Sequence, residues 1–212
     1  MKYTSYVIVM AFLVALSASS LSAQLIIEDF ESYIDTSSLQ ADVFSFGSAA
    51  QAGKPSLAIG LGENDTNAAC FNLTWETGNN ANVSFINLSP NTQNLNSYSE
   101  VTAFIFIEDY PSGPELPGAA AAATSATIVK LAIEGADGSI WQTRSVKASR
   151  PTVNASDTLR FRLSPLDMER VEGQGQFPGT LSNIKNIRLR FENSRRSGFR
   201  QDAYIDSITA VQ

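Results

Sequence analysis

The chain has 212 residues, of which 21 are Asp or Glu and 15 are Lys or Arg, so its formal net charge at pH 7 is −6. A chain of this length can form one domain with a sizeable core, and its negative charge makes it a poor general binder of nucleic acid. The sequence contains no histidine, which excludes Ser-His-Asp catalysis, Cys-His catalysis and a His-ligated zinc site.

The first segment is typical of a secretory signal peptide. Lys2 provides a basic start, residues 7–16 form an apolar run that is short for a membrane span, and residues 17–23 are small and weakly polar. We expect cleavage after Ala23, which leaves residues 24–212 as a secreted domain, either extracellular, at the cell surface or in the periplasm. No second apolar stretch follows, so the sequence predicts no membrane span.

Strand patterns dominate the remaining sequence. Apolar residues recur at every second position or in β-rich runs in about ten segments, and Gly, Pro, Asn and Ser clusters separate these segments. The segments are residues 25–33, 56–61, 69–76, 82–88, 100–107, 126–134, 139–146, 158–163, 184–192 and 203–211. No window has a convincing helical period, although residues 165–170 could form one short helical turn. The pattern predicts an all-β fold, an antiparallel β-sandwich of the jelly-roll kind in one domain.

Turns and loops between these segments give further expectations. Asp137-Gly138 lies between two strand segments, and this dipeptide favours the positive φ angles that a tight hairpin needs. Residues 108–124 and 171–182 read as long surface loops, which often form the rims of ligand sites on a sandwich. Tyr110 in the first loop, and Tyr98 before it, are possible sugar contacts.

Acidic residues stand out in the first and last strand segments. Residues 26–31 read IIEDFE, and residues 204–208 read YIDSI. If these two segments lie side by side, Glu31 and Asp206 could converge on a hard cation such as calcium, which prefers oxygen ligands. The alternative is that both are ordinary solvent-facing acids at strand edges.

Two strand segments alternate arginines with apolar residues. Because the apolar residues must face the core, Arg160 and Arg162 point outward from one segment, and Arg188 and Arg190 point outward from the other. If the two strands share a sheet face, the four guanidinium groups could bind the carboxylates or sulfates of an acidic polysaccharide. The alternative is that these arginines pair with Glu134, Glu192 or other acids, or serve only solubility.

The two tryptophans are candidates for stacking against sugar rings. Trp75 shares its phase with Phe71 and Leu73, so we expect it in the core. Trp141 follows the predicted hairpin and is the better candidate for a binding platform, with core packing as its alternative.

The order of several short blocks resembles a known family. The blocks are residues 26–31, 53–59, 158–167, 179–187 and 203–208. Together they resemble the galactose-binding-like jelly rolls, and most of all the family 11 carbohydrate-binding modules and their relatives. The resemblance implies a structural calcium ion held by acids of the first and last strands, here Glu31 and Asp206, with Asp29 as a neighbour on the strand face of Glu31. It implies no cellulase accessory role, because the family's modules usually accompany a catalytic domain that this chain lacks.

These patterns predict a secreted, non-catalytic protein that binds a polysaccharide or other glycan and holds a structural calcium ion. An acidic polysaccharide is a possible preference. The alternative is a structural or adhesive cell-surface protein that uses the same fold for protein contacts. A glycosidase with two carboxylates also stays open as an alternative, because the chain has many acids and no motif singles out a pair.

Overall fold

The structure of the chain is a computed structural model. It describes residues 23–46, 55–75, 82–87, 94–110, 127–152, 154–173, 176–178, 180–193 and 199–212. Residues 1–22 of the expected signal peptide therefore lie outside the described residues. Within the described part of the chain, no helix is both long enough and apolar enough to cross a membrane.

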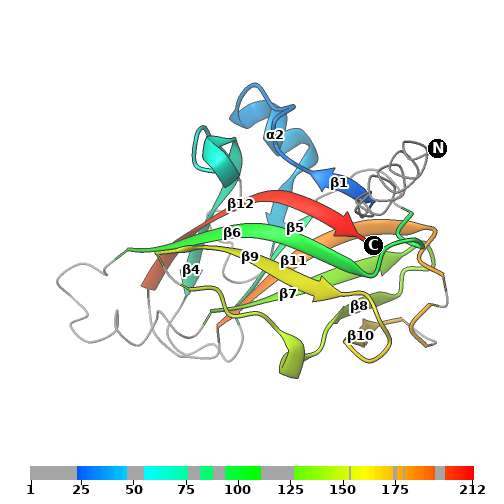
Figure 1. Cartoon of the computed structure of the whole chain (residues 1–212). Coiled ribbons are helices and arrows are strands. Elements are labelled where there is room, and N and C mark those ends of the chain that lie inside the picture. Colours follow the sequence, from blue (N-terminus) through cyan, green and yellow to red (C-terminus); the bar gives the residue numbers. More distant parts are fainter. Residues whose placement is uncertain are drawn as a thin grey trace, which may run out of the picture.

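The described residues form two antiparallel six-stranded sheets, which pack as a sandwich (Figure 1). We call the sheet that contains the last strand sheet A. Its strands run in the order β3-β4-β12-β6-β9, and β1 also pairs with β12. Their bounds are β1 Gln24–Glu28, β3 Ser56–Ala58, β4 Ala68–Trp75, β6 Glu100–Tyr110, β9 Ser156–Arg162 and β12 Phe199–Val211.

The second sheet, sheet B, has the order β10-β8-β7-β11-β5-β2. Its strands are β2 Phe44–Phe46, β5 Asn82–Asn87, β7 Thr127–Gly135, β8 Ile140–Thr143, β10 Met168–Glu172 and β11 Ile184–Asn193. The expected all-β jelly-roll sandwich is thus confirmed, and so is the hairpin at Asp137-Gly138, which joins β7 to β8 with Gly138 at a φ of 80°.

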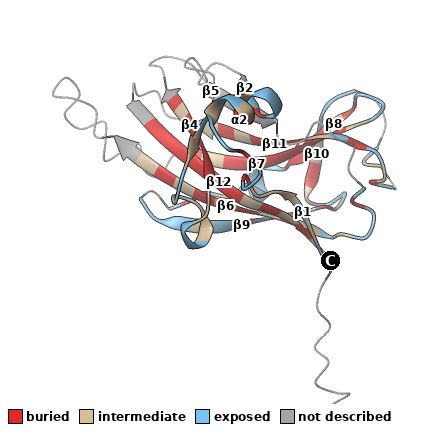
Figure 2. Cartoon of the chain, turned by 90° about the horizontal axis from the view of Figure 1, so that it is seen from above, coloured by how far each residue is buried: buried red, intermediate tan, exposed pale blue. Residues whose placement is uncertain are grey.

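The core lies between the facing surfaces of the two sheets. Ile105 and Ile205 from sheet A, and Leu131 and Leu189 from sheet B, are fully buried. Figure 2 shows buried residues as bands along the strands of both layers, with exposed residues in the connections, around the one described α-helix and along β9. The strict alternation seen in the sequence therefore sends one set of side chains inward and leaves the other set on the two outer faces.

Two local expectations were wrong, and a third holds only in part. A helix, α2 (Thr36–Asp42), forms where none was expected, because Asp35 and Ser38 make a reciprocal capping box at its start. The short helical turn expected in residues 165–170 is present in part, because the backbone N of Met168 donates to the carbonyl oxygen of Ser164 at 3.0 Å, but β10 begins at Met168. Strand β1 ends at Glu28 instead of reaching residue 33, because Phe30 has a φ of 57° and turns the chain away from the sheet.

Candidate functional site

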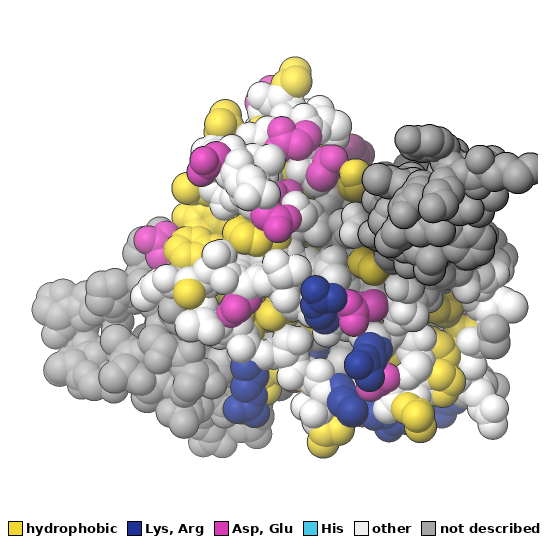
Figure 3. All heavy atoms as spheres, viewed as in Figure 1, with side chains coloured by type: hydrophobic (Ala, Val, Ile, Leu, Met, Phe, Trp, Pro, Cys, Tyr) yellow, Lys and Arg dark blue, Asp and Glu magenta, His cyan; other side chains and the backbone are white. Residues whose placement is uncertain are grey.

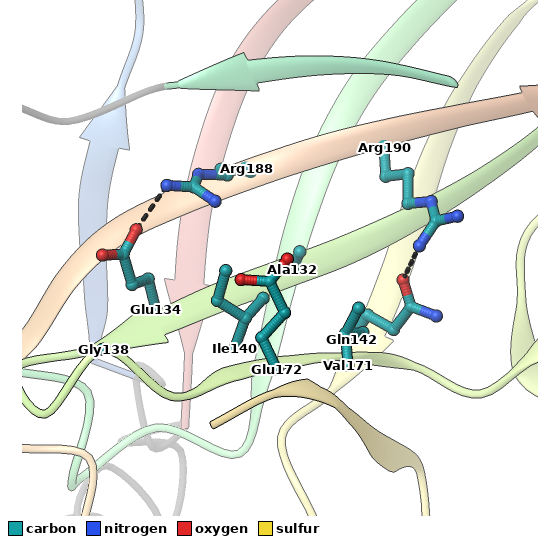
Figure 4. Close-up of a pocket in the computed structure, with 9 residues that line it drawn as sticks. All are labelled: Ala132, Glu134, Gly138, Ile140, Gln142, Val171, Glu172, Arg188 and Arg190. Atoms are coloured by element: carbon teal, nitrogen blue, oxygen red, sulfur yellow. Dashed lines mark hydrogen bonds and ion pairs between the residues drawn. The ribbon is translucent and has the colours of Figure 1, made fainter. Parts of the chain in front are cut away.

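The outer face of sheet B carries a hollow, which we call the groove. Its cavity has a volume of about 380 Å³. Figure 4 shows its lining residues, which come from β7, β8, β10 and β11 and from the hairpin between β7 and β8. They are Ala132, Glu134, Gly138, Ile140, Gln142, Val171, Glu172, Arg188 and Arg190.

One cross-strand row of sheet B passes through the groove. The register places one residue from each strand of sheet B along this row, from β2 to β10. In that order they are Phe44, Asn87, Arg188, Ala132, Gln142 and Glu169. Ala132 has the smallest side chain in the row and lies between Arg188 and Gln142, so the floor is lowest there. Phe44, at the β2 end, keeps 49% of its surface exposed.

Glu134 holds one side of the groove together. Its Oε2 atom accepts a hydrogen bond from Nδ2 of Asn186 at 2.8 Å and forms an ion pair with Nη2 of Arg188. Its Oε1 atom lies 3.4 Å from Nζ of Lys185. The carboxylate thus fixes the guanidinium of Arg188 at the rim of the cavity (Figure 4).

Gln142 holds the other side. Its Oε1 atom accepts a hydrogen bond from Nη1 of Arg190 at 2.5 Å, and its Nε2 atom donates to Oε1 of Glu169 at 2.9 Å. Arg190 also pairs through Nε with Glu192 at 2.6 Å, and Glu192 in turn lies 3.3 Å from Nζ of the buried Lys130. The polar groups of the groove are therefore held in place before any ligand arrives, which reduces the entropy that binding would have to overcome.

The charges around Glu134 affect its protonation. Burial raises the pKa of this carboxyl, but the hydrogen bond from Asn186 and the positive charges of Arg188 and Lys185 outweigh burial and hold the pKa below its usual value of 4.5. A carboxyl with a lowered pKa in the folded protein stabilises the fold above its unfolded-state pKa, and this stabilisation is lost as the pH falls through the folded-state pKa.

We therefore expect a pH-dependent difference between the parent protein and Glu134→Gln. At pH 6–7 the parent should melt at the higher temperature, and the gap should narrow as the pH falls below about 4.5. Thermal unfolding followed by circular dichroism across this range would measure it. A gap that stays constant down to pH 3 would show that the charge of Glu134 does not contribute to the stability of the groove.

The predicted face of four arginines does not exist. Arg160 and Arg162 lie on β9 in sheet A, whereas Arg188 and Arg190 lie on β11 in sheet B. The alternative reading, in which these arginines pair with Glu134 and Glu192, is the one found for β11. Arg188 pairs with Glu134, and Arg190 pairs with Glu192. The alternation of β9 and β11 predicted correctly that all four side chains point away from the core, but the two strands belong to opposite layers.

The aromatic candidates are placed differently from the expected platform. Trp141 is only 6% exposed and packs in the core, with its ring edge-on to Phe177 at a centroid distance of 5.4 Å. Core packing, the alternative for Trp141, is therefore correct. Tyr98 is partly buried against the core. Tyr110 is the last residue of β6 rather than part of a loop, and its side chain, like that of Trp75, lies outside the described residues.

The terminal strands do lie side by side, as expected. Strand β1 pairs antiparallel with β12, with Gln24 opposite Val211. A bulge follows Asp206, where Ser207 has a φ of 49°, and it changes the phase of the outward side chains. The end of β1 and the residues that follow it therefore lie beside Asp206 and the loop that follows β3, and we call this region the acidic corner.

Asp206 is the buried centre of the acidic corner. Its side chain is 1% exposed, and its Oδ2 atom accepts hydrogen bonds from the backbone N of Glu63 at 2.9 Å and from Oγ1 of Thr66 at 2.7 Å. Its Oδ1 atom accepts from the backbone N of Ser207 at 2.6 Å. Glu31 reaches the same loop, since its Oε1 atom accepts from the backbone N of Asn67 at 2.5 Å.

The three expected metal ligands do not form one cluster. Among the residues that the structure describes, no three His, Cys, Asp or Glu side chains lie close enough together to hold a metal ion. The reason is that Asp29 and Glu31 follow the end of β1, where Oδ1 of Asp29 accepts from the backbone N of Glu31 at 3.2 Å and Glu31 turns toward Asn67. Asp206 instead points into the loop at Gly62.

Other oxygen atoms gather around Asp206. A Cβ atom added at Gly62 would lie 2.6 Å from the carbonyl oxygen of Asn67, 2.7 Å from Oγ1 of Thr66 and closer still to Oδ2 of Asp206. These oxygens converge so tightly that only glycine fits at this position. Carboxylate, hydroxyl and carbonyl oxygens are the ligands that calcium prefers, so the donor chemistry fits this ion even though the expected trio does not.

The charge of the corner is one-sided. The described residues 23–46 and 55–75 contain Asp and Glu side chains and no Lys or Arg. Figure 3 shows acidic side chains gathered around α2 and the loop after β3, on the part of this face farthest from β9. Burial also raises the pKa of Glu28 at the end of β1. A cation at this corner would offset this concentration of negative charge.

Sequence reasoning named Arg188, Arg190 and Glu134, which line the groove, but missed its other lining residues. The alternation in residues 126–134 places Lys130, Ala132 and Glu134 on the outer face, and a small residue between two charged ones was a usable signal for a hollow. Gln142 and Glu172 had no such signal, because their place in the groove depends on how β8 and β10 pair.

No protein family model and no curated protein matches the sequence. Solved structures match its fold. One is a family 11 carbohydrate-binding module of a cellulosomal cellulase of Clostridium thermocellum, 14% identical, with a TM-score of 0.51 over 91% of this chain and 96% of that one. Another is a family 28 carbohydrate-binding module specific for non-crystalline cellulose, 11% identical, with a TM-score of 0.54 over 87% of this chain and 92% of that one.

An exo-β-agarase also matches, at 13% identity and a TM-score of 0.51, over 88% of this chain and 24% of the enzyme. The resemblance expected from the sequence is thus confirmed at the level of fold, a jelly roll like that of the carbohydrate-binding modules.

Proposed function

We propose that the chain is a secreted, non-catalytic carbohydrate-binding protein and that its glycan lies in the groove on sheet B. The observation that carries this proposal is the groove itself, a cavity of about 380 Å³ on an outer sheet face, lined by hydrogen-bonding side chains that Glu134 and Gln142 already hold in place. Sugar hydroxyls need such donors and acceptors in fixed positions. The shared fold of the two carbohydrate-binding modules supports the same reading.

The groove favours a neutral glycan. Its charged lining residues are two glutamates and two arginines, and both arginines are engaged by acids of the same face. An anionic sugar would have to compete with Glu134 and Glu192 for these guanidinium groups, and it would also meet the carboxylate of Glu172. The preference for an acidic polysaccharide that the sequence suggested therefore has no support at this place.

We also propose that the acidic corner holds a structural calcium ion. Asp206, Thr66 and the carbonyl group of Asn67 would hold it, with Glu31 as the second carboxylate nearby. The ion would supply charge neutralisation where two strands, β1 and β12, join the loop after β3. The support is the donor chemistry and the absence of Lys and Arg from the described residues of this corner.

The function is tested by measuring binding to neutral glycans. The purified domain should be retarded in a native gel that contains soluble mixed-linkage β-glucan, or be retained by non-crystalline cellulose or agarose. Since no ion pair with a neutral sugar can form, affinity should change less than about twofold between about 50 mM and about 500 mM salt. Absence of retention by all three polysaccharides would contradict the proposal.

A further inference from the structure

A second cavity lies at the open edge of the sandwich, away from the groove. It has a volume of about 380 Å³ and lies between β9, the edge strand of sheet A, and the segment that follows β8 of sheet B. Its charged lining residues are Arg160, Arg162, Lys147, Glu100 and Asp167. We call it the edge pocket.

The ion pairs of the edge pocket engage two of its three cationic side chains. The register places Glu100 directly opposite Arg162, but Oε1 of Glu100 lies 3.0 Å from Nη1 of Arg160, the diagonal neighbour. Lys147 faces Asp167 at a distance of 3.7 Å between Nζ and Oδ1. Within the described part of the chain, the guanidinium of Arg162 has no carboxylate partner.

The edge pocket is therefore positive in a negative protein. Three cationic side chains face two carboxylates, which leaves one positive charge, whereas the whole chain carries −6. Figure 3 shows basic side chains, interspersed with acidic ones, near the arrowhead end of β9 and around β8 and β10, while the acidic corner lies on the opposite part of this face. This separation of charge would orient an anionic chain toward the edge pocket and away from the acidic corner.

We propose that the edge pocket binds one anionic group of a glycan, a carboxylate or a sulfate, through Arg162 and with support from Arg160 and Lys147. A guanidinium binds either group through two parallel hydrogen bonds. Arg160 and Arg162 lie two residues apart on one face of β9, about 7 Å along the strand, so one anion can contact both. The glycan nature of the ligand rests on the proposed function, whereas the anion site itself depends only on these charges.

The proposal is tested with polygalacturonate as the carboxylate probe, dextran sulfate as the sulfate probe and unmodified dextran as the uncharged control. At about 150 mM salt the parent protein should bind at least one anionic probe and not dextran. Arg162→Gln should weaken this binding by about fivefold or more, and the charged probe that responds identifies the group. Arg162 is exposed, so the variant should melt at the parent temperature.

Arg150→Gln is the matched control. It removes the same charge from an exposed arginine that does not line the edge pocket, and binding should change less than about twofold. Equal losses in the two variants would show diffuse attraction and overturn the proposal, as would failure of both anionic probes to bind. Arg162→Gln should leave retention by mixed-linkage β-glucan unchanged. The test of glycan binding in the groove and the test of anion binding in the edge pocket therefore give separate results.

Discussion

Replacing Ala132 with phenylalanine should reduce binding of neutral glycans by about tenfold or more, which corresponds to about 1.4 kcal/mol of binding free energy. Ala132 forms the floor of the groove between Arg188 and Gln142, so an added ring would occupy the space that the sugar needs. Isothermal titration with soluble oligosaccharides of the retained polysaccharide would measure the loss.

The control for this variant is Thr158→Phe. Thr158 is exposed on β9 of sheet A, so the same ring is added outside the groove and affinity should be unchanged. Because Ala132 is itself covered by its neighbours, the melting temperature of Ala132→Phe must be measured as well, and Ala132→Leu provides a smaller filling residue if the ring disturbs the sheet. A well-folded filled variant that binds as tightly as the parent would place the glycan elsewhere.

Replacing Asp206 with alanine should lower the free energy of unfolding by about 3 kcal/mol. The substitution leaves the backbone N–H groups of Glu63 and Ser207 and the hydroxyl of Thr66 without their carboxylate acceptor in a buried place. For a domain of this size, the melting temperature should fall by roughly 6–12 °C. Chemical denaturation and thermal melting would both measure this change.

Substitutions at Asp206 also test the proposal that the acidic corner holds a calcium ion. The parent protein should melt several degrees higher in calcium than in EDTA, because an ion that binds only the folded state stabilises it. Asp206→Asn keeps an acceptor oxygen and loses the charge, so it should fold but lose this calcium-dependent rise. Asp202 is a buried acid on the same strand, and its Oδ1 atom accepts a hydrogen bond from Nδ2 of Asn72 at 2.5 Å. Asp202→Asn should therefore keep the calcium-dependent rise in melting temperature. Equal melting temperatures of the parent protein in calcium and in EDTA would contradict the proposal that the acidic corner holds a calcium ion.

Much of the fold followed from alternation alone. In residues 159–163 and 187–191 the strict two-residue period identified strands and their inward faces, because core burial demands it. A strand in either sheet has the same two-residue period. The period therefore could not predict that β9 and β11 lie in opposite layers. Partners such as Glu100 for Arg160 and Glu134 for Arg188 come from other strands, far away in sequence.

The candidate site was less predictable than the fold. The pairing of the terminal strands was expected. The positive φ of Phe30 and the bulge at Ser207, however, redirect the side chains of Asp29, Glu31 and Asp206. Neither phenylalanine nor serine is a residue type that predicts a positive φ. The groove depends on a row of residues across six strands, of which only Arg188, and Ala132 with its neighbours on β7, stand out in the sequence. A cavity of this kind arises from register, which local patterns do not determine.

The position of β12 has a consequence for how the chain folds. This strand pairs with β1, β4 and β6, so it joins residues as far apart as Gln24 and Val211. Such distant pairings make loop closure slow, and sheet A cannot be completed until residues 199–211 have been synthesised. During synthesis the apolar faces of β4 and β6 would lack their central partner, so the polypeptide would stay without its native packing until a late stage.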